Sequence, residues 1–229
     1  MGGQACVLYG AAEFSRDTDF AILASPANLS RLRAALADLQ AEVIAVPPFE
    51  LKYLRRGHAV HFRCHHPEAT NMRVDVMTKM RGVDSFSKLW QRRVTLRAED
   101  GTSYELMSLH DLVKAKKTQR DKDWPMIRRL VEADYFRYRE KPTAKELRFW
   151  FLELRTPELL SDLAAAHSDP CLKLTKQRPL LKLAAAGKQS DLVEALTEEE
   201  RLEREADRQY WAPLKAELEN LRRTRLQPA

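Results

Sequence analysis

Short strand-like runs alternate with a helical one in the first part of the chain. Leucines recur every three or four residues over 28–40, which predicts an amphipathic helix with Asn28 or Ser30 as its cap. Turn-forming residues over 65–71 predict that the two strands around them form a hairpin. The apolar runs that predict strands are 20–23, 42–46, 58–64, 72–77 and 94–96.

From Ser108 onward the pattern becomes helical throughout. A helix is expected to start at Ser108 and to run over 112–133, with a break near 121–125. Further helices are predicted over 143–154, 180–186, 191–196 and 197–225. The pattern therefore predicts an α+β fold: a small mixed sheet flanked by helices, followed by an all-helical C-terminal region. We expect one domain over 1–135 and a second over 136–229.

Composition narrows the class of protein. The chain has 229 residues, of which 44% are hydrophobic and 31% charged, and this is typical of a globular protein with a substantial core. No apolar run approaches the ~20 residues of a membrane helix, so no membrane partner is expected. Three widely spaced cysteines without a Cys-x-x-Cys pair argue against a disulfide framework or a zinc ribbon. A reducing cytoplasm is the expected compartment.

Positive charge is concentrated in the middle of the chain. Residues 51–100 carry a net charge of +6 and residues 101–150 carry +4, within a total of +6. Such a block suits a polyphosphate or nucleic-acid partner, or it is a solvated surface. The same two interpretations apply to the pair Lys114 and Lys117, which would share a helix face, and to the arginine pairs at 55–56 and 92–93.

Three aspartates form the candidate catalytic group. Asp17 and Asp19 stand two positions apart at the start of a predicted strand, so their carboxylates would project from one face. Asp75 interrupts a second apolar strand, where a buried acid needs a partner or a metal ion. Three acids on adjacent strands can hold two hard divalent ions about 3.5–4 Å apart.

The order of these residues resembles the nucleotidyltransferase superfamily, which includes DNA polymerase beta, the aminoglycoside nucleotidyltransferases and the toxin-type enzymes of abortive-infection systems. The family pattern is a hydrophobic residue, Gly, then Gly or Ser, a spacer, Asp-x-Asp and a later strand acid. Here Gly2-Gly3, Asp17-Thr18-Asp19 and Asp75 match it, and the resemblance continues over 111–114 and 120–123. It covers about residues 1–135 and is nearest to the stand-alone bacterial members.

The resemblance implies a fold and a chemistry. Asp17, Asp19 and Asp75 would bind Mg²⁺ or Mn²⁺. The residues that would line the pocket for the NTP triphosphate are Gly2, Gly3, Ser15, Arg16, Lys114 and Lys117. The glycine pair would form a turn against the phosphates, within a nucleotidyltransferase-type sheet.

Two departures from the family pattern change this expectation. Thr18 stands between the acids, where the family usually has an apolar residue. The family's first strand and its preceding helix come just before the glycine pair, whereas this sequence starts at Met1, so either the true start lies upstream or this variant has lost the element. Loss of that strand would expose a sheet edge.

Each candidate residue also has a plainer interpretation. Asp17 and Asp19 would otherwise be turn or capping residues, and Asp75 would pair with Arg73 or Arg63.

The histidine-rich stretch 58–66 with Cys64 is expected to be a surface hairpin rather than a zinc site, because alternation puts His58 and His61 on opposite faces. The aromatic run 149–151 fits a helix core better than a base-stacking surface.

Two functions follow. The first is an enzyme that moves an NMP from an NTP to a hydroxyl acceptor on RNA, on a protein or on a small molecule, with release of pyrophosphate. The second is a catalytically inactive module of the same fold that acts as an antitoxin-like regulator or binds nucleic acid.

Overall fold

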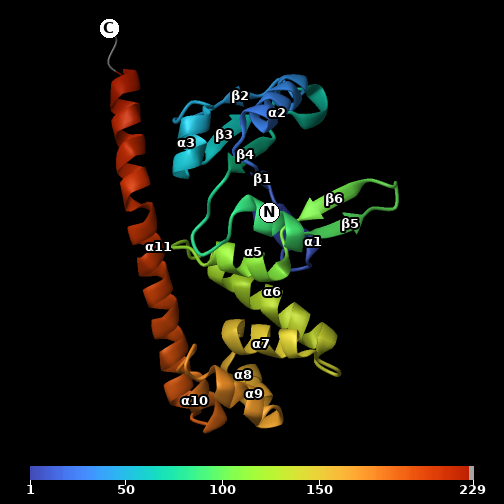
Figure 1. Cartoon of the computed structure of the whole chain (residues 1–229), viewed down its shortest axis with the longest axis vertical. Helices are drawn as coiled ribbons and strands as arrows, with labels where there is room; N and C mark the ends of the chain where they lie inside the picture. Colours follow the sequence, from blue (N-terminus) through green and yellow to red (C-terminus); the bar gives the residue numbers. More distant parts are fainter. Residues whose placement is uncertain (227–229) are drawn as a thin grey trace. The chain divides into compact units, whose positions relative to one another are not determined.

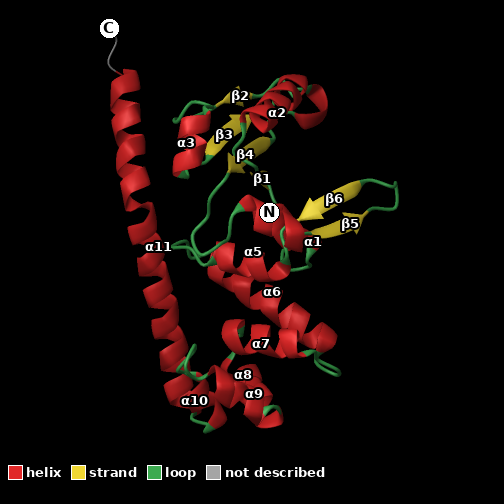
Figure 2. Cartoon of the chain, viewed as in Figure 1, coloured by secondary structure: helices red, strands yellow, loops and turns green. Residues whose placement is uncertain are grey.

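The computed structural model describes residues 1–226 and has an α+β fold, as the sequence predicts (Figure 1, Figure 2). The chain forms two compact units. The first comprises residues 1–115 and the chain from residue 209 on, and the second comprises residues 116–208.

This division differs from the expected boundary at residue 135. Helix α6 (Asp123–Tyr138) packs on helix α7 (Ala144–Glu153), so the two helices belong to one unit. The indole of Trp150 donates a hydrogen bond to Asp134 at 2.8 Å, and its ring lies edge-on to Tyr135. These contacts cross the predicted boundary, which therefore lies inside a packed core.

A four-stranded mixed sheet forms the centre of the first unit. Its order is β1-β4-β3-β2, with β1 parallel to β4 and the other neighbours antiparallel. The predicted hairpin is confirmed as β3 and β4. The bounds of the strands are β1 Asp17–Ala21, β2 Glu42–Val43, β3 Val60–Arg63 and β4 Arg73–Met77. A separate hairpin pairs β5 (Val94–Arg97) with β6 (Ser103–Leu106), and the pattern of apolar positions did not reveal β6.

Alternation along β3 and β4 separates a hydrophobic face from a polar one. Val60, Phe62, Val74 and Val76 are buried against helix α2 (Pro26–Asp38). Asp75, between the two valines, therefore projects to the opposite face. The cap of α2 is Ser25, not Asn28 or Ser30, because Pro26 already occupies the first helical position.

Short helices complete the first unit. The expected start at Ser108 is confirmed, because its hydroxyl accepts a hydrogen bond from the Asp111 amide. The remaining helices are α1 Gly2–Leu8, α3 Leu51–Arg56, α4 Phe86–Arg92, α5 Leu109–Lys116 and the part of α11 from Gln209 onward. The break predicted near 121–125 lies earlier, over 117–122 between α5 and α6, and Pro125 is inside α6.

The second unit is entirely helical in its described residues. Thr143 and Glu146 form a capping box at the start of α7, and Phe149–Phe151 are buried, which confirms the core interpretation. The other helices are α8 Pro157–Ala166, α9 Ser168–Leu174, α10 Leu181–Ala185 and α11 Gln189–Leu226. The sequence pattern missed α8 and α9, and it divided α11 in two. Within residues 1–226, no helix combines the length and apolarity needed to cross a bilayer.

A buried aspartate ties the start of the second unit together. Asp123 is fully buried and accepts bonds from Lys116 Nζ at 3.0 Å, Thr118 Oγ1 at 2.6 Å and Arg120 Nε at 2.8 Å. Burial alone would raise the pKa of Asp123, but these cations and the Thr118 hydroxyl outweigh it, so the pKa lies below its ordinary value. Asp123 is therefore ionised at neutral pH and its charge stabilises the fold.

We expect Asp123→Asn to lower the free energy of unfolding by about 3 kcal/mol at neutral pH, because Lys116 stays buried without its counter-charge. The wild-type advantage is present above the ordinary aspartate pKa and is lost as pH falls through the lower folded pKa. Urea unfolding at about pH 7 and about pH 2.5 tests this, since the gap should shrink in acid. The exposed Asp162→Asn is the matched control, and an equal gap at both pH values contradicts the assignment.

Candidate active site

Strands β1 and β4 bring the three predicted aspartates onto one face of the sheet. In the parallel register Asp19 lies beside Asp75, and Asp17 lies beside Arg73. Asp17 and Asp19 are half-buried, whereas Asp75 is only 7% exposed. We call Asp17, Asp19 and Asp75 the acidic face.

Asp75 is held by two neighbours on the same face. Its Oδ1 lies 2.8 Å from Arg73 Nε and 2.8 Å from His61 Nδ1. Burial would raise the pKa of Asp75, but the bonds from His61 and Arg73 outweigh it and the pKa lies below its ordinary value. Of the two arginine partners open at the sequence level, Arg73 is therefore the one that the fold selects.

Arg73 carries the positive charge of this face. The hydrogen bond to Asp75 raises the pKa of Arg73, and the charges of Asp17 and Asp19 act in the same direction. Its Nη2 lies 3.0 Å from His61 Nδ1. This nitrogen accepts from Arg73 when it carries no hydrogen and donates to Asp75 when it carries one. A guanidinium thus lies among the carboxylates.

His61 was missed as a member of the site. The predicted hairpin could have identified it, because pairing of the two strands places His61 in register with Asp75. The companion expectation that His58 is a surface residue is wrong: it is 2% exposed, and its Nε2 lies 2.8 Å from Glu217 of α11. That partner is far away in sequence, so no local pattern indicates it.

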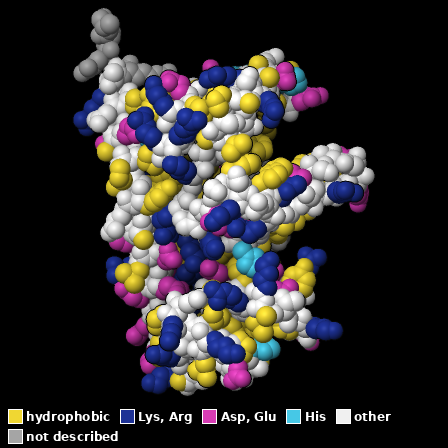
Figure 3. Space-filling view, viewed as in Figure 1, with side chains coloured by type: hydrophobic (Ala, Val, Ile, Leu, Met, Phe, Trp, Pro, Cys, Tyr) yellow, Lys and Arg dark blue, Asp and Glu magenta, His cyan; other side chains and the backbone are white. Residues whose placement is uncertain are grey.

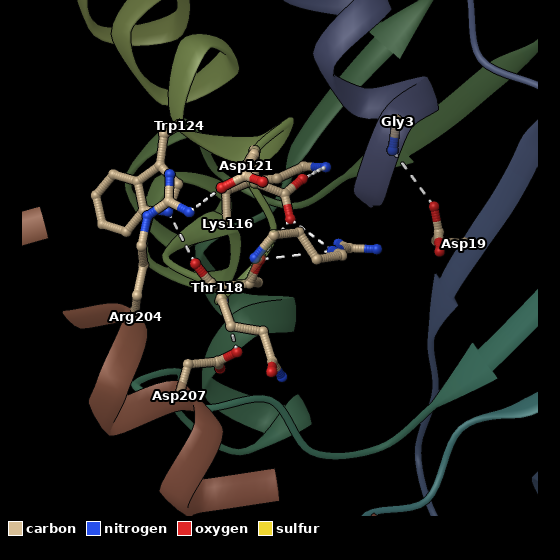
Figure 4. A network of polar contacts seen from close by, with 11 residues as sticks. Gly3, Asp19, Lys116, Thr118, Asp121, Trp124, Arg204 and Asp207 are labelled. Carbon is tan, nitrogen blue, oxygen red and sulfur yellow. Dashed lines mark hydrogen bonds and ion pairs between the residues drawn. The ribbon is translucent and has the colours of Figure 1, made fainter. Parts of the chain in front are cut away.

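The glycine pair lies where α1 meets β1. Gly2 and Gly3 begin this helix rather than forming the expected turn. A Cβ on Gly2 would meet Asp19 Oδ2 at 1.8 Å, and one on Gly3 would meet Ser15 Oγ at 2.3 Å. The Gly3 amide donates to Asp19 Oδ2 at 3.3 Å (Figure 4). Side chains are excluded here because the helix approaches the acidic face so closely.

The segment before β1 carries the next two predicted residues. The Ser15 hydroxyl donates to the Asp17 carbonyl at 2.9 Å, and the Gln4 side chain donates to the Ser15 carbonyl at 3.0 Å. Ser15 therefore shapes the entry to β1. Arg16 is exposed beside it.

Lys114 and Lys117 do not share a helix face as predicted. Helix α5 ends at Lys116, so Lys117 lies beyond it in the second unit, whereas Lys114 is exposed in the first. Lys117 Nζ lies 2.8 Å from Glu153 and 3.8 Å from Glu203. Its charge is already paired inside the second unit.

Hard divalent cations prefer oxygen ligands, and three carboxylates share one face of the sheet. Across residues 1–226, however, no group of three or more His, Cys, Asp or Glu side chains is arranged to hold a metal ion. Asp75 Oδ1 is engaged by Arg73 and His61. A metal ion bound through this oxygen would have to displace Arg73 from Asp75.

Comparison of the chain with protein-family models, curated proteins and solved structures gives no match. The function is therefore inferred from the residues of this chain alone.

We expect Gly2→Ala to loosen α1 more than Gly82→Ala does. Both glycines have positive φ, +64° and +69°, but a Cβ on Gly82 meets nothing within 4 Å, so Gly82→Ala controls for backbone strain alone. The added clash with Asp19 should speed amide exchange over residues 4–11 by about tenfold, measured by hydrogen-exchange mass spectrometry. Equal exchange in the two variants would contradict the close approach.

Proposed function

We propose that this chain is a metal-dependent nucleotidyltransferase that moves an NMP from an NTP to a hydroxyl acceptor and releases pyrophosphate. The observation that carries the proposal is the parallel register that sets Asp19 beside Asp75, with Asp17 two positions away on the same face. The tight packing of Gly2 and Gly3 against Asp19 and Ser15 supports it, because it explains the glycine pair together with the acids.

In this proposal Asp17, Asp19 and Asp75 hold Mg²⁺ or Mn²⁺. When bound, such ions neutralise phosphate charge and activate the acceptor hydroxyl. The acceptor oxygen attacks the α-phosphorus, the bond to the bridging oxygen breaks, and pyrophosphate leaves. The hydroxyl proton passes to a base, for which the candidate is the Asp75 carboxylate. Its lowered pKa keeps it ionised at neutral pH but makes it a weak base.

The other predicted residues differ in how directly we expect them to contact the phosphates. Arg16 and Lys114 are exposed cations in the first unit and are available to phosphate oxygens. Ser15 and the glycines shape the backbone beside the acidic face. Lys117 would have to leave Glu153 before it met a phosphate, so we assign it the weakest role.

The acceptor is proposed only as a class: a hydroxyl of RNA, of a protein or of a small molecule. Over the visible face, lysine and arginine side chains are interspersed with acidic and apolar ones (Figure 3). This mixture argues for a local acceptor site rather than a continuous basic track on that face.

We expect transfer of α-labelled NMP to a cellular acceptor to fall by about a hundredfold or more in Asp19→Asn and Asp75→Asn. Each reaction contains Mg²⁺ or Mn²⁺, one α-labelled NTP, and bulk RNA or protein. Asp38→Asn makes the same charge change at an exposed position of α2 and should keep wild-type activity.

Circular dichroism of each variant separates loss of chemistry from loss of fold. Label that persists in Asp75→Asn would overturn the assigned base and metal ligand. Absence of label from the folded wild type with every acceptor class would favour the second function below.

The second candidate is a catalytically inactive module of the same type. One observation favours it: Arg73 forms an ion pair with Asp75 and places a permanent cation among the carboxylates. Asp75 thus has a counter-charge without a metal ion. The two functions therefore differ in whether a metal ion can replace the guanidinium.

If the site is a metal centre, we expect Mn²⁺ to bind Arg73→Gln about tenfold more tightly than wild type, because a competing cation has been removed from Asp75. Calorimetric titration measures this. Arg31→Gln, an exposed position on α2 at the opposite face of the sheet, is the charge-matched control. Absence of Mn²⁺ binding in both wild type and Arg73→Gln would support the inactive module.

A further inference from the structure

A pocket of about 570 Å³ opens in the second unit, within the size range of small-molecule sites. Four arginines from three parts of the unit line it, and an indole ring forms part of its wall. We call it the arginine pocket; these residues are Arg128 and Arg129 of α6, Arg155 after α7, Arg204 of α11, and Trp124.

Arg155 is the buried charge of this pocket. It is 5% exposed, and within the described chain its Nε and Nη1 have no hydrogen-bond partner. Its Nη2 lies 3.3 Å from Glu199, but that carboxylate already accepts two shorter bonds from Arg178, at 2.8 and 3.0 Å. Burial lowers the pKa of Arg155 and outweighs the opposing charge of Glu199, while the neighbouring charge of Arg178 acts with burial. A guanidinium remains protonated even so, and its charge is under-compensated.

Two more arginines of the pocket are uncommitted. Arg128 and Arg129 are exposed, and neither forms a hydrogen bond or ion pair with another residue that the structure describes. Arg204, in contrast, is bound to Asp121 (Figure 4) and also to Glu200 of its own helix.

The acidic residues of the wall do not balance this charge. Asp121 and Glu200 are both bound to Arg204, and Glu132 accepts a hydrogen bond from Thr156. Four arginines against three carboxylates leave the pocket positive, and the excess lies on Arg128, Arg129 and Arg155.

Trp124 supplies the apolar part of the site. The guanidinium of Arg155 lies 4.5 Å from its ring centroid and that of Arg204 lies 5.5 Å away. The indole nitrogen donates to the Thr118 carbonyl at 2.8 Å, which orients the ring. Flat cations are thereby held beside a fixed aromatic surface.

We infer that the arginine pocket binds a phosphorylated small molecule that carries two or more phosphate groups. Guanidinium forks match phosphate oxygens in pairs, so a ligand that meets Arg128, Arg129 and Arg155 together needs more than one phosphate group. A single phosphate would leave most of the 570 Å³ empty, whereas a polyphosphate or a phosphorylated compound with an organic part would fill it. The site shares no residue with the acidic face, so it adds a second ligand to the proposed chemistry.

Calorimetric titration of the full chain with tripolyphosphate tests this inference. The titration is made in EDTA, so that no divalent cation can recruit the probe to the acidic face. We expect Arg128→Gln/Arg129→Gln to weaken binding at least about tenfold, since two exposed guanidinium groups are lost. Arg137→Gln, exposed on the same helix but outside the pocket, should bind like wild type.

Arg155→Gln should weaken binding further, and its thermal unfolding is measured in parallel because the residue is buried. The exposed double variant keeps the test valid if Arg155→Gln fails to fold. Inorganic phosphate and citrate distinguish a single phosphate or a polycarboxylate from the expected polyphosphate, and tighter binding of either would overturn the assigned class.

Three results would overturn the pocket itself. The first is that wild type does not bind tripolyphosphate, and the second is that the double variant binds it as tightly as wild type. The third is that only an RNA oligomer binds, which would indicate a nucleic-acid surface. Tripolyphosphate binding that persists in Asp19→Asn would support the pocket whether or not nucleotidyl transfer is found.

Discussion

The parallel register between β1 and β4 is the constraint on which the acidic face depends. Val74 and Val76 are buried in the core of the first unit, so Asp75 between them must project to the other side. A slip of β4 by one residue would bury this carboxylate and expose both valines, at a cost of several kcal/mol. The juxtaposition of Asp19 and Asp75 is therefore enforced by hydrophobic packing.

Because Asp19 and Asp75 are held side by side, their negative charges require a nearby cation. Carboxylates on neighbouring strands repel one another unless a cation lies among them, and burial of Asp75 strengthens this requirement. Arg73, two residues before Asp75 on the same strand face, meets it here. A metal ion would meet it as well, with more charge and with open coordination positions. Enzyme and inactive module thus share one architecture and differ in which cation the acids hold.

Sequence reasoning recovered what depends on local periodicity. Alternation of apolar and polar residues predicts the central strands, their hairpin and the face on which Asp75 lies. It also allows Asp75 to pair with Arg73, because residues i and i+2 share a strand face. Features decided by distant partners were not predictable: the burial of His58 depends on Glu217. The end of α5 before Lys117 also escaped prediction, because neighbouring lysines continue a helical pattern without marking its last residue.

The basic middle of the chain illustrates why net charge is a poor guide to partners. Lys116 and Arg120 contact the buried Asp123, and Lys117 is paired with Glu153, so several of these cations are engaged within the fold. Four further arginines of the second unit line the arginine pocket, where they surround a cavity instead of spreading over a surface. Charge that is confined in this way selects a compact polyanion over a long one, because only a compact polyanion can meet all of the guanidinium groups at once.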